Sequence, residues 1–372
     1  MNPDLYFVRC PDYGSALPDA LGHLLDLTGW LRDTQLAGKR VLLKPNLLTD
    51  RPPEQAVTTH PELIRHVIRL LKPTGAKLSV GDSPASAANL QQVWQTTGIA
   101  AICEEEHVPL ISFEEAGAVP FTRDGFSFTL ARSVLEADLI INLPKVKSHS
   151  LTLLTAAVKN LYGAVPGYTK TTLHRLHPTP KRFGALVRAL WQELPETWTI
   201  ADAVTGMEGQ GPANGRPVNL GFLAAAKDAF MLDLALCQIL SIDARRVPYL
   251  TAHDLSQSAQ IMRHGDPIEV PHFETPTGAH LLSLIPPWLI DHAGRCLWVR
   301  PAFSEKACLR CGKCVKACPA QALSLSPSHQ IPSLEKARCI SCCCCHEVCP
   351  ADAIRMTQSR LLRTLNVFKG LA

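Results

Sequence analysis

A chain of 372 residues is long enough for two domains, or for one large domain with a small appendage. Its formal net charge of +4 is small and its basic residues are scattered among 33 acidic ones, which argues against a dedicated nucleic-acid-binding protein. The N-terminal sequence lacks a basic stretch followed by an apolar run, and no window is apolar enough to span a membrane. We therefore expect a cytoplasmic protein with no transmembrane segment.

Short apolar runs alternate with helical patterns upstream of residue 300. In chain order, strands are predicted over residues 39–48, 76–84, 137–145 and 197–204, and helices over residues 61–75 and 151–163. Strands that alternate with helices predict an α/β domain with a mainly parallel, doubly wound sheet. Such a sheet binds ligands beyond the carboxyl ends of its strands.

Polar side chains gather at the predicted carboxyl ends of these strands and in the segments that follow. The set is Lys44, Asn46, Asp82, Lys145, Lys147, His149, Lys159, Asn160, Lys170, His174 and His177. The alternate spacing of Lys145, Lys147 and His149 puts them on one face if the chain stays extended. So many cations would suit an anionic ligand such as a phosphate, a carboxylate or an enolate-like intermediate. The alternative for each single residue is a solvated side chain at a loop mouth; for the cluster we favour a site.

A glycine-rich segment, residues 205–217 ("TGMEGQGPANGRP"), follows the last predicted strand. It matches neither a P-loop nor the G-x-G-x-x-G fingerprint, because no G-K-[ST] follows and no helix opens directly after it. Its glycines would let the backbone approach a ligand closely, with a purely structural loop as the equal alternative. Asp202 and Glu208 are the acid or base candidates in this region.

Ten of the 14 cysteines fall between Cys308 and Cys349, so the composition changes near residue 300. Residues 308–323 ("CLRCGKCVKACPAQAL") align with residues 339–354 ("CISCCCCHEVCPADAI") at a constant offset, which identifies an internal duplication. Each copy carries the C-x-x-C-x-x-C-x-x-x-C-P run of a 4Fe-4S cluster, in which the fourth cysteine ligates the other cluster. The prediction is two 4Fe-4S clusters, one held by Cys308, Cys311, Cys314 and Cys349 and the other by Cys339, Cys342, Cys345 and Cys318.

Zinc and disulfides are the alternatives for these cysteines. A zinc ribbon explains neither the third cysteine of each triplet nor the Cys-Pro ending, and a disulfide knot needs an oxidising compartment. Cys343 and Cys344 are left over by the assignment. They are either small buried residues that donate weak S–H hydrogen bonds, or a redox-active or cluster-tuning thiol pair.

We therefore expect three parts in the chain. Residues 1–295 form the α/β domain, residues 300–358 a small α+β domain like a bacterial ferredoxin, and residues 359–372 a C-terminal tail. The tail is apolar at helical spacing and by default packs on the small domain; a dimer contact or a membrane surface are the alternatives.

Several segments together carry a resemblance to a known family. "LLKPNLL", "GDSP", "ADLIINLPKVKSHSLTLLTAAVKNLYGAVPG" and "GMEGQGPANGRP", ahead of a doubled ferredoxin run, look like the bacterial and archaeal family numbered 362 among domains of unknown function. The resemblance covers most of residues 35–240 and implies an iron–sulfur protein associated with electron transfer. It departs at Cys343, where relatives often have an aromatic residue. The polar positions that the family shares map to Lys44, Asn46, Asp82, Lys145, Lys147, His149, Lys159, Asn160 and Asp228.

Two main hypotheses of function follow. In the first, an iron–sulfur oxidoreductase passes electrons to an anionic substrate or redox partner at the basic rim; Lys145, Lys147 and His149 stabilise negative charge and His149 or His174 donates a proton. Substrate binding would fall to Lys44, Asn46, Asp82, Lys159 and Asn160. In the second, the chain is a ferredoxin-type carrier or adaptor that exchanges electrons with another ferredoxin or a reductase. A metal-cofactor maturation factor is a third hypothesis.

Overall fold

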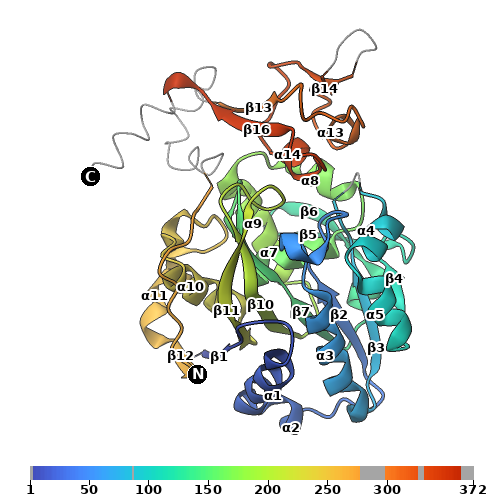
Figure 1. The fold of residues 1–372 in the computed structure, drawn as a ribbon, viewed down its shortest axis with the longest axis vertical. Coiled ribbons are helices and arrows are strands. Elements are labelled where there is room, and N and C mark those ends of the chain that lie inside the picture. Colours follow the sequence, from blue (N-terminus) through green and yellow to red (C-terminus); the bar gives the residue numbers. More distant parts are fainter. Residues whose placement is uncertain (1–2, 86–87, 277–297, 326–330, 362–372) are drawn as a thin grey trace.

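The computed structural model describes residues 3–85, 88–276, 298–325 and 331–361. The larger part, called the body here (residues 3–276), is built on a ten-stranded sheet in the order β12-β1-β11-β10-β7-β2-β3-β4, with β8 attached to β10 and β9 attached to β8 (Figure 1). Its strands are β1 (Asp4–Arg9), β2 (Arg40–Pro45), β3 (Lys77–Asp82), β4 (Leu110–Ser112), β7 (Leu139–Leu143), β8 (Lys145–His149), β9 (Leu153–Thr155), β10 (Thr197–Glu208), β11 (Arg216–Ala226) and β12 (Met262–Gly265). Strands β5 (Ala118–Arg123) and β6 (Phe126–Ala131) form a separate hairpin.

The sheet is mixed and mostly parallel. The pairs of β2 with β3 and β7, β3 with β4, β10 with β7 and β8, and β1 with β12 are parallel, whereas β11 runs antiparallel to both β1 and β10, and β9 to β8. The predicted α/β class is thus confirmed, with antiparallel pairs that the prediction did not specify.

Helices cover both faces of the sheet because its central strands are apolar on both sides. In β2, Leu42 belongs to one buried cluster and its neighbours Val41 and Leu43 to another. Helices α1, α3 and α5 pack in the second cluster, and α7, α9 and α10 in the first. The helix bounds are α1 (Ala16–Thr28), α2 (Trp30–Asp33), α3 (Pro61–Leu71), α4 (Leu90–Thr96), α5 (Ile99–Glu105), α6 (Arg132–Leu135), α7 (Ala157–Asn160), α8 (Thr169–Leu176), α9 (Pro180–Trp191), α10 (Ala229–Ile239) and α11 (Ala252–Ser256).

Two predicted elements differ from the structure. The helix expected over residues 151–163 is wrong in its first half: residues 153–155 form β9, which turns back antiparallel along β8, and α7 starts only at Ala157. The turn into α7 is fixed by the buried Asp233 carboxylate, which accepts hydrogen bonds from the N–H groups of Ala157 and Val158 at 2.7 and 3.0 Å. The loop expected over residues 205–217 is shorter, because β10 continues to Glu208 and β11 begins at Arg216.

The cysteine-rich part, called the module here (residues 299–358), contains two antiparallel strand pairs and two short helices. Strand β13 (Val299–Phe303) pairs with β16 (Ile354–Gln358), and β14 (Leu323–Ser324) with β15 (Ser333–Leu334). Helices α13 (Lys313–Lys316) and α14 (Cys344–Glu347) lie at equivalent positions of the two sequence copies. Figure 1 shows the module at the end of the body where α8 lies.

The backbone repeats the duplication seen in the sequence. Positive φ angles occur at matched positions 31 residues apart, at Arg310 and Ser341 (55° and 57°) and at Gly312 and Cys343 (71° and 65°). Cys343 therefore holds a left-handed conformation for which the first copy uses glycine.

Within the described part of the chain, no helix combines the length and apolar character needed to cross a membrane. Most of the predicted C-terminal tail, from residue 362 onward, lies outside the described residues, as does Cys296.

Candidate functional site

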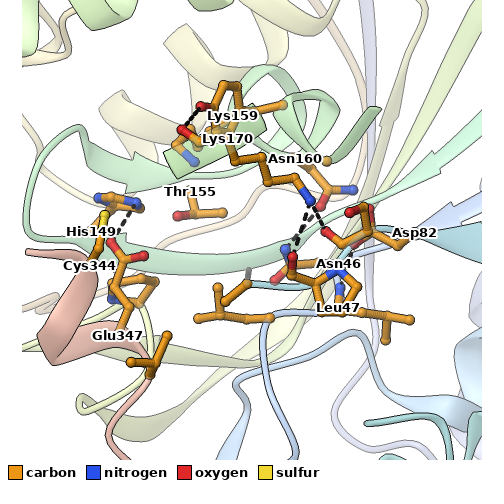
Figure 2. Close-up of a pocket in the computed structure, with 18 of the residues that line it drawn as sticks. Asn46, Leu47, Asp82, His149, Thr155, Lys159, Asn160, Lys170, Cys344 and Glu347 are labelled. Carbon is orange, nitrogen blue, oxygen red and sulfur yellow. Dashed lines mark hydrogen bonds and ion pairs between the residues drawn. The ribbon is translucent and has the colours of Figure 1, made fainter. Parts of the chain in front are cut away.

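A cavity of about 90 Å³ lies where the module meets the carboxyl ends of the strands of the body (Figure 2). The body contributes the ends of β2 and β3, strands β8 and β9, and helices α7 and α8, and the module contributes α14. The polar residues that line the cavity are Asn46, Asp82, Ser83, Lys147, His149, Thr155, Lys159, Asn160, Lys170, Thr171, His174, Cys344 and Glu347. Residues that are far apart in the sequence, from Asn46 to Val348, thus line one partly open cavity.

The structure brings most of the predicted rim residues together. Eight of them line the cavity: Asn46, Asp82, Lys147, His149, Lys159, Asn160, Lys170 and His174. Lys44 and Lys145 do not line it. His177 lies elsewhere, with its Nδ1 accepting a hydrogen bond from Arg182. Asp228 caps helix α10 by accepting from the N–H groups of Phe230 and Met231, which is a structural role.

Lys44 lies under the cavity, paired with one of its lining residues. Its ammonium is 2.7 Å from Asp82 Oδ1, and both side chains are buried. Burial lowers the pKa of Lys44, although the Asp82 carboxylate opposes that shift. Gly163 packs against this pair so closely that a β-carbon there would lie 2.2 Å from Asp82 Oδ1 and 2.6 Å from Lys44 Nζ. Asp82 and Gly163 line the cavity, and Lys44 holds Asp82 in place from outside it.

Replacing Gly163 with alanine is therefore expected to break the Lys44–Asp82 pair. Disrupting a buried ion pair costs about 3–5 kcal/mol, so the free energy of unfolding should fall by roughly that amount in chemical denaturation. The matched control is Gly22→Ala in the middle of α1, where a β-carbon meets nothing within 4 Å. There alanine should be neutral or slightly stabilising. Equal stability of the two variants would contradict the prediction.

Lys145 is held in a separate buried network behind the cavity. Its ammonium lies 2.6 Å from Asp202 Oδ2 and 2.8 Å from the Tyr13 hydroxyl oxygen. The Tyr13 hydroxyl donates to Asp202 at 2.6 Å, and its ring stacks on His60. Simple alternation predicted that Lys145 and Lys147 share one face. The register of β8 against β10 shifts between Asp202 and Met207, so the two lysine side chains have different surroundings. Asp202, one predicted acid or base, is thereby bound to Lys145.

Glu208, the other acid or base candidate, also lies away from the cavity. Its carboxylate accepts from Arg216 at 2.8 Å and from the backbone N–H of Glu274 at 2.7 Å. The glycines beside it serve close packing of the backbone: a β-carbon on Gly211 would lie 2.2 Å from the carbonyl oxygen of Ser148. Only Pro212 of this segment lines the cavity.

Three lysines in the cavity have no carboxylate within ion-pair distance among the described residues. Lys147 donates to the carbonyl oxygen of Val57 at 2.6 Å. Lys170 donates to the carbonyl oxygens of Ser83 and Pro84. The ammonium of Lys159 lies 4.8 Å from the centre of the Tyr162 ring. Each ammonium keeps further N–H groups for a ligand, because an ammonium has three donors.

Burial changes the charge that these lysines carry. It lowers the pKa of Lys147 to about 7, with the positive charge of Lys159 adding to the effect. Burial likewise lowers the pKa of Lys170 to about 7 and that of Lys159 below its usual range. Lys147 and Lys170 are therefore only partly protonated near neutral pH. An anion in the cavity would favour their charged forms.

His149 is a neutral hydrogen-bond donor facing the module. Its Nδ1 accepts from the N–H groups of Leu151 and Thr152 at 3.0 and 3.3 Å, so the proton of the neutral ring is on Nε2. Nε2 lies 3.7 Å from Oε1 of Glu347 (Figure 2). Burial holds the pKa of His149 well below its usual range and raises that of Glu347. Both effects reduce the charge in the cavity wall.

His174 is also neutral near pH 7. It stacks on Phe183 with ring centres 4.3 Å apart and meets the edge of Tyr162. Burial lowers its pKa to about 3. Burial therefore favours the neutral form of both cavity histidines, and the proton-donor role that the sequence suggested for one of them stays a prediction.

Besides Asp82 Oδ1, which is ion-paired with Lys44, three buried polar atoms on the cavity wall lack a hydrogen-bond partner among the described residues. They are Asn46 Oδ1, Thr155 Oγ1 and Glu347 Oε1. Asn46 is otherwise fixed by donating from Nδ2 to Asn160 at 3.0 Å. Because an unpartnered buried polar group costs roughly 1–3 kcal/mol, several such atoms around one cavity indicate a space built for a polar ligand or ordered water.

The eight predicted cluster cysteines fall into two groups around two further cavities in the module. The first cysteine set is Cys308, Cys311, Cys314 and Cys349, which line one cavity. The second cysteine set is Cys318, Cys339, Cys342 and Cys345, which line the other. Among the described residues, no group of three or more His, Cys, Asp or Glu side chains converges as ligands of a single metal ion.

The two remaining cysteines of the module have different surroundings. Cys343 is buried and belongs to the main apolar cluster of the body. Cys344 lines the polar cavity, and its thiol donates a weak hydrogen bond to the carbonyl oxygen of Cys342 in the second cysteine set at 3.9 Å. Cys344 thus lies between the second cysteine set and the cavity.

Polar contacts fix the module on the body. Arg51 Nη2 donates to the carbonyl oxygen of Cys349 and to Asp352 Oδ1, both at 2.8 Å. Asn214 donates to the carbonyl oxygen of His346 at 3.0 Å, and Lys313 lies 3.0 Å from Asp50. These contacts surround the cavity on the module side.

Arg51→Ala is expected to loosen the module without unfolding the body. The variant leaves a buried carbonyl without its donor, which costs about 1–3 kcal/mol. Backbone amides of residues 344–352 should exchange hydrogen roughly tenfold faster or more, while those of β2 and β7 stay protected. The control is Arg40→Ala, which removes an exposed pair with Asp138 and should change exchange only locally. Unchanged exchange in residues 344–352 would refute the role of Arg51.

Sequence reasoning missed Cys344 and Glu347 as cavity residues, and it placed Lys170 in the basic rim without assigning it a role in binding or catalysis. A signal for two of them exists in the duplication. Glu347 stands where the first copy has Lys316, and Cys344 where it has Lys313. A comparison of the two copies would have marked both positions as different in charge.

Comparison with known proteins gives matches over both parts of the chain. The model of the family described as "Domain of unknown function (DUF362)" matches residues 41–238, and that of a 4Fe-4S binding domain matches residues 300–323. A thylakoid-associated protein of Synechocystis is 34% identical over 257 residues, which cover 68% of this chain and 79% of that protein.

Two solved structures resemble the chain at lower identity. One is a protein of Thermotoga maritima with 13% identity and a TM-score of 0.40; the match covers 63% of this chain and 60% of that one. The other is the lactate racemase apoprotein of Thermoanaerobacterium thermosaccharolyticum with 15% identity and a TM-score of 0.40, over 65% of this chain and 57% of that one.

Proposed function

The chain belongs to the DUF362 family and carries a 4Fe-4S binding domain, and from this premise we propose that it is an iron–sulfur reductase. In this proposal, electrons pass from two 4Fe-4S clusters in the module to a small anionic substrate in the polar cavity. One observation carries it: Cys344 and Glu347, which neighbour the predicted ligands Cys342 and Cys345, line the same cavity as Lys147 and Lys170.

The cysteines of the module fit two clusters. Each cysteine set supplies four sulfur donors around its own cavity. Each short helix links the sets, because Cys314 and Cys318 near α13, and Cys345 and Cys349 near α14, belong to different sets. Four helical residues rise about 6 Å, so the two sites would be neighbours. When bound, such clusters supply electrons one at a time.

The cavity wall supports an anionic ligand. Lys147, Lys159 and Lys170 bring three ammonium groups, and the only carboxylates that line the cavity among the described residues are Glu347 and Asp82, the second already paired with Lys44. Buried ammonium groups stabilise negative charge far better than ammonium groups in water. The unpartnered oxygens Asn46 Oδ1 and Thr155 Oγ1 would form hydrogen bonds that orient the uncharged part of the ligand.

Lys147 is the residue we assign as proton donor. Reduction of an unsaturated group consumes protons as well as electrons, and a general acid works best when its pKa is near the working pH. The pKa of Lys147 is lowered to about 7. In this scheme the neutral Nε2–H of His149 donates a hydrogen bond and does not give up its proton.

Binding of a simple anion should depend on pH in a defined direction. Lys147 and Lys170 are charged below their pKa of about 7 and neutral above it. Sulfate does not titrate in this range, so its affinity should fall by about tenfold or more between roughly pH 7 and pH 9. Calorimetry in two buffers should also show proton uptake on binding. A pH-independent affinity would contradict the assignment of these lysines.

The test of the proposed function is a reoxidation experiment. Anaerobically reduced protein is mixed with a panel of small carboxylates and oxyanions, and the return of cluster absorbance is followed. The proposal expects saturable reoxidation by at least one small anion, with sulfate as a competitive inhibitor. Reoxidation that is linear in oxidant concentration and insensitive to sulfate for every compound would instead favour the ferredoxin-type carrier.

The cellular setting of the proposal is cytoplasmic, with a redox protein as electron donor. The Synechocystis relative is named a thylakoid-associated protein. That name supports a role close to an electron-transferring membrane, at which a peripheral reductase would meet reduced carriers.

A further inference from the structure

The two cysteine sets differ in their access to solvent. Cys311 of the first set is exposed, and it alone is exposed among the cysteines that the structure describes. The cavity of the first set is also lined by Leu309, whose side chain is 68% exposed. The second set instead adjoins Cys343, which is buried, and Cys344, which faces the polar cavity. Cys318, Cys339 and Cys342 of the second set are only partly exposed, so the point at which an external electron donor can approach a cysteine of the module most closely is Cys311 of the first set.

Charge is distributed unequally between the two copies of the duplication. Residues 331–358 contain three basic and three acidic residues. Residues 299–325 contain one acidic residue, Glu305, and five basic ones: Arg300, Lys306, Arg310, Lys313 and Lys316. The excess of positive charge in the first copy equals the formal net charge of the whole chain, +4.

Part of this charge is exposed and lies within seven residues of Leu309 in sequence, the exposed apolar residue beside the first set. Lys306, Arg310 and Lys316 are exposed, whereas Lys313 turns inward to Asp50. We call Lys306, Leu309, Arg310 and Lys316 the basic patch. An exposed apolar centre with a charged rim is the usual composition of a transient protein interface.

We infer that the basic patch docks an acidic one-electron carrier protein of the ferredoxin type. In each encounter the carrier is oxidised by one electron and the first-set centre is reduced by one, with no bond formed and no proton moved. Long-range attraction between opposite charges raises association rates without requiring a tight complex, which suits a carrier that must leave after each transfer. The inference rests on the proposed function insofar as the electrons delivered here are those used at the polar cavity.

The experiment follows reduction of the chain itself, with no small substrate present. A reduced acidic 2Fe-2S ferredoxin is mixed with the protein in a stopped-flow instrument, and the second-order rate constant is measured at low and high salt. The test variant is Lys306→Glu with Lys316→Glu. The matched control is Lys336→Glu with Arg355→Glu, which makes the same change of net charge at exposed positions of the second copy.

The expected result at low salt is a loss of about tenfold or more in the rate constant for the test variant, and a loss of less than about threefold for the control. At high salt the rate constants of the parent protein and of both variants should become similar, because exposed charges are screened. Unchanged reduction by photoreduced deazaflavin, a small reductant, would show that the test variant keeps its clusters. Equal losses in both variants, or no loss in either, would contradict the inference that the basic patch docks the carrier.

Failure of this inference can be told apart from failure of the proposed function. The measured rate concerns only the transfer from carrier to chain and needs no oxidant in the cavity. If the basic patch supports fast reduction by the carrier but no small anion reoxidises the protein, the docking inference stands and the proposed reductase function is wrong.

Discussion

Replacing Lys147 with methionine should abolish substrate reduction while leaving the clusters intact. Methionine keeps an unbranched side chain of similar length and removes both the charge and the donated proton. General acid catalysis contributes about 10²- to 10⁴-fold, so turnover should fall by at least the lower figure. Cluster absorbance and reduction by dithionite should stay as in the parent protein, because Lys147 donates to the carbonyl oxygen of Val57 and lines the polar cavity, not the cavity of either cysteine set.

Lys147→Arg separates the two roles that we assign to this lysine. Arginine keeps a positive charge but holds its proton at any accessible pH. The variant should therefore bind sulfate with an affinity that is within a few fold of the parent, and should still fail to turn over. Activity retained in Lys147→Arg would remove the proton-donor role, and activity retained in Lys147→Met would show that the cavity is not the site of reduction.

The second large effect is expected at Cys342. This residue belongs to the second cysteine set and hydrogen-bonds to Cys344 on the cavity wall. Cys342→Ser should weaken or remove one of the two predicted clusters, so that iron per chain falls from about eight toward four. Reduction of a substrate in the cavity should be lost, whereas a carrier at the basic patch should still reduce the remaining centre.

Cys343→Gly is the matched control for Cys342→Ser. Cys343 has a φ angle of 65° and stands where the first copy has Gly312, so glycine fits its backbone without strain. We expect this variant to keep both clusters and its activity, with a modest loss of stability because a buried thiol is removed. Loss of iron in Cys343→Gly would mean that the crossed assignment of eight cysteines is incomplete.

Local patterns were enough for much of the fold. The spacing of Leu63, Val67 and Leu71 with Pro61 at the start predicts α3, and the apolar run of β7 predicts a central strand. The hairpin of β8 and β9 escaped prediction because "LTLLTAAVKN" reads equally well as a helix. The choice is made by pairing with β8 and by Asp233, which lies 76 residues from Ala157 in sequence.

The part of the site at the ends of neighbouring parallel strands follows most directly from the sequence. Asn46 and Asp82 follow neighbouring strands, β2 and β3, so the sheet itself brings them to one edge. Lys145 could not be distinguished from Lys147 by alternation, because a register shift against β10 and a carboxylate from Asp202 redirect it. Glu347 and Cys344 reach the cavity through docking of the module, which no local pattern encodes.

The most direct test of the account is a redox titration followed by EPR, carried out with and without saturating sulfate. If two 4Fe-4S clusters are present and one adjoins an anion site, the spectra should resolve two centres. Sulfate should lower the midpoint potential of one of them, since a nearby anion disfavours the added electron. The shift should be absent in Lys147→Met. Zinc without labile sulfide, or sulfate that shifts both centres equally or neither, would contradict the central claim that one cluster lies beside an anion-binding cavity.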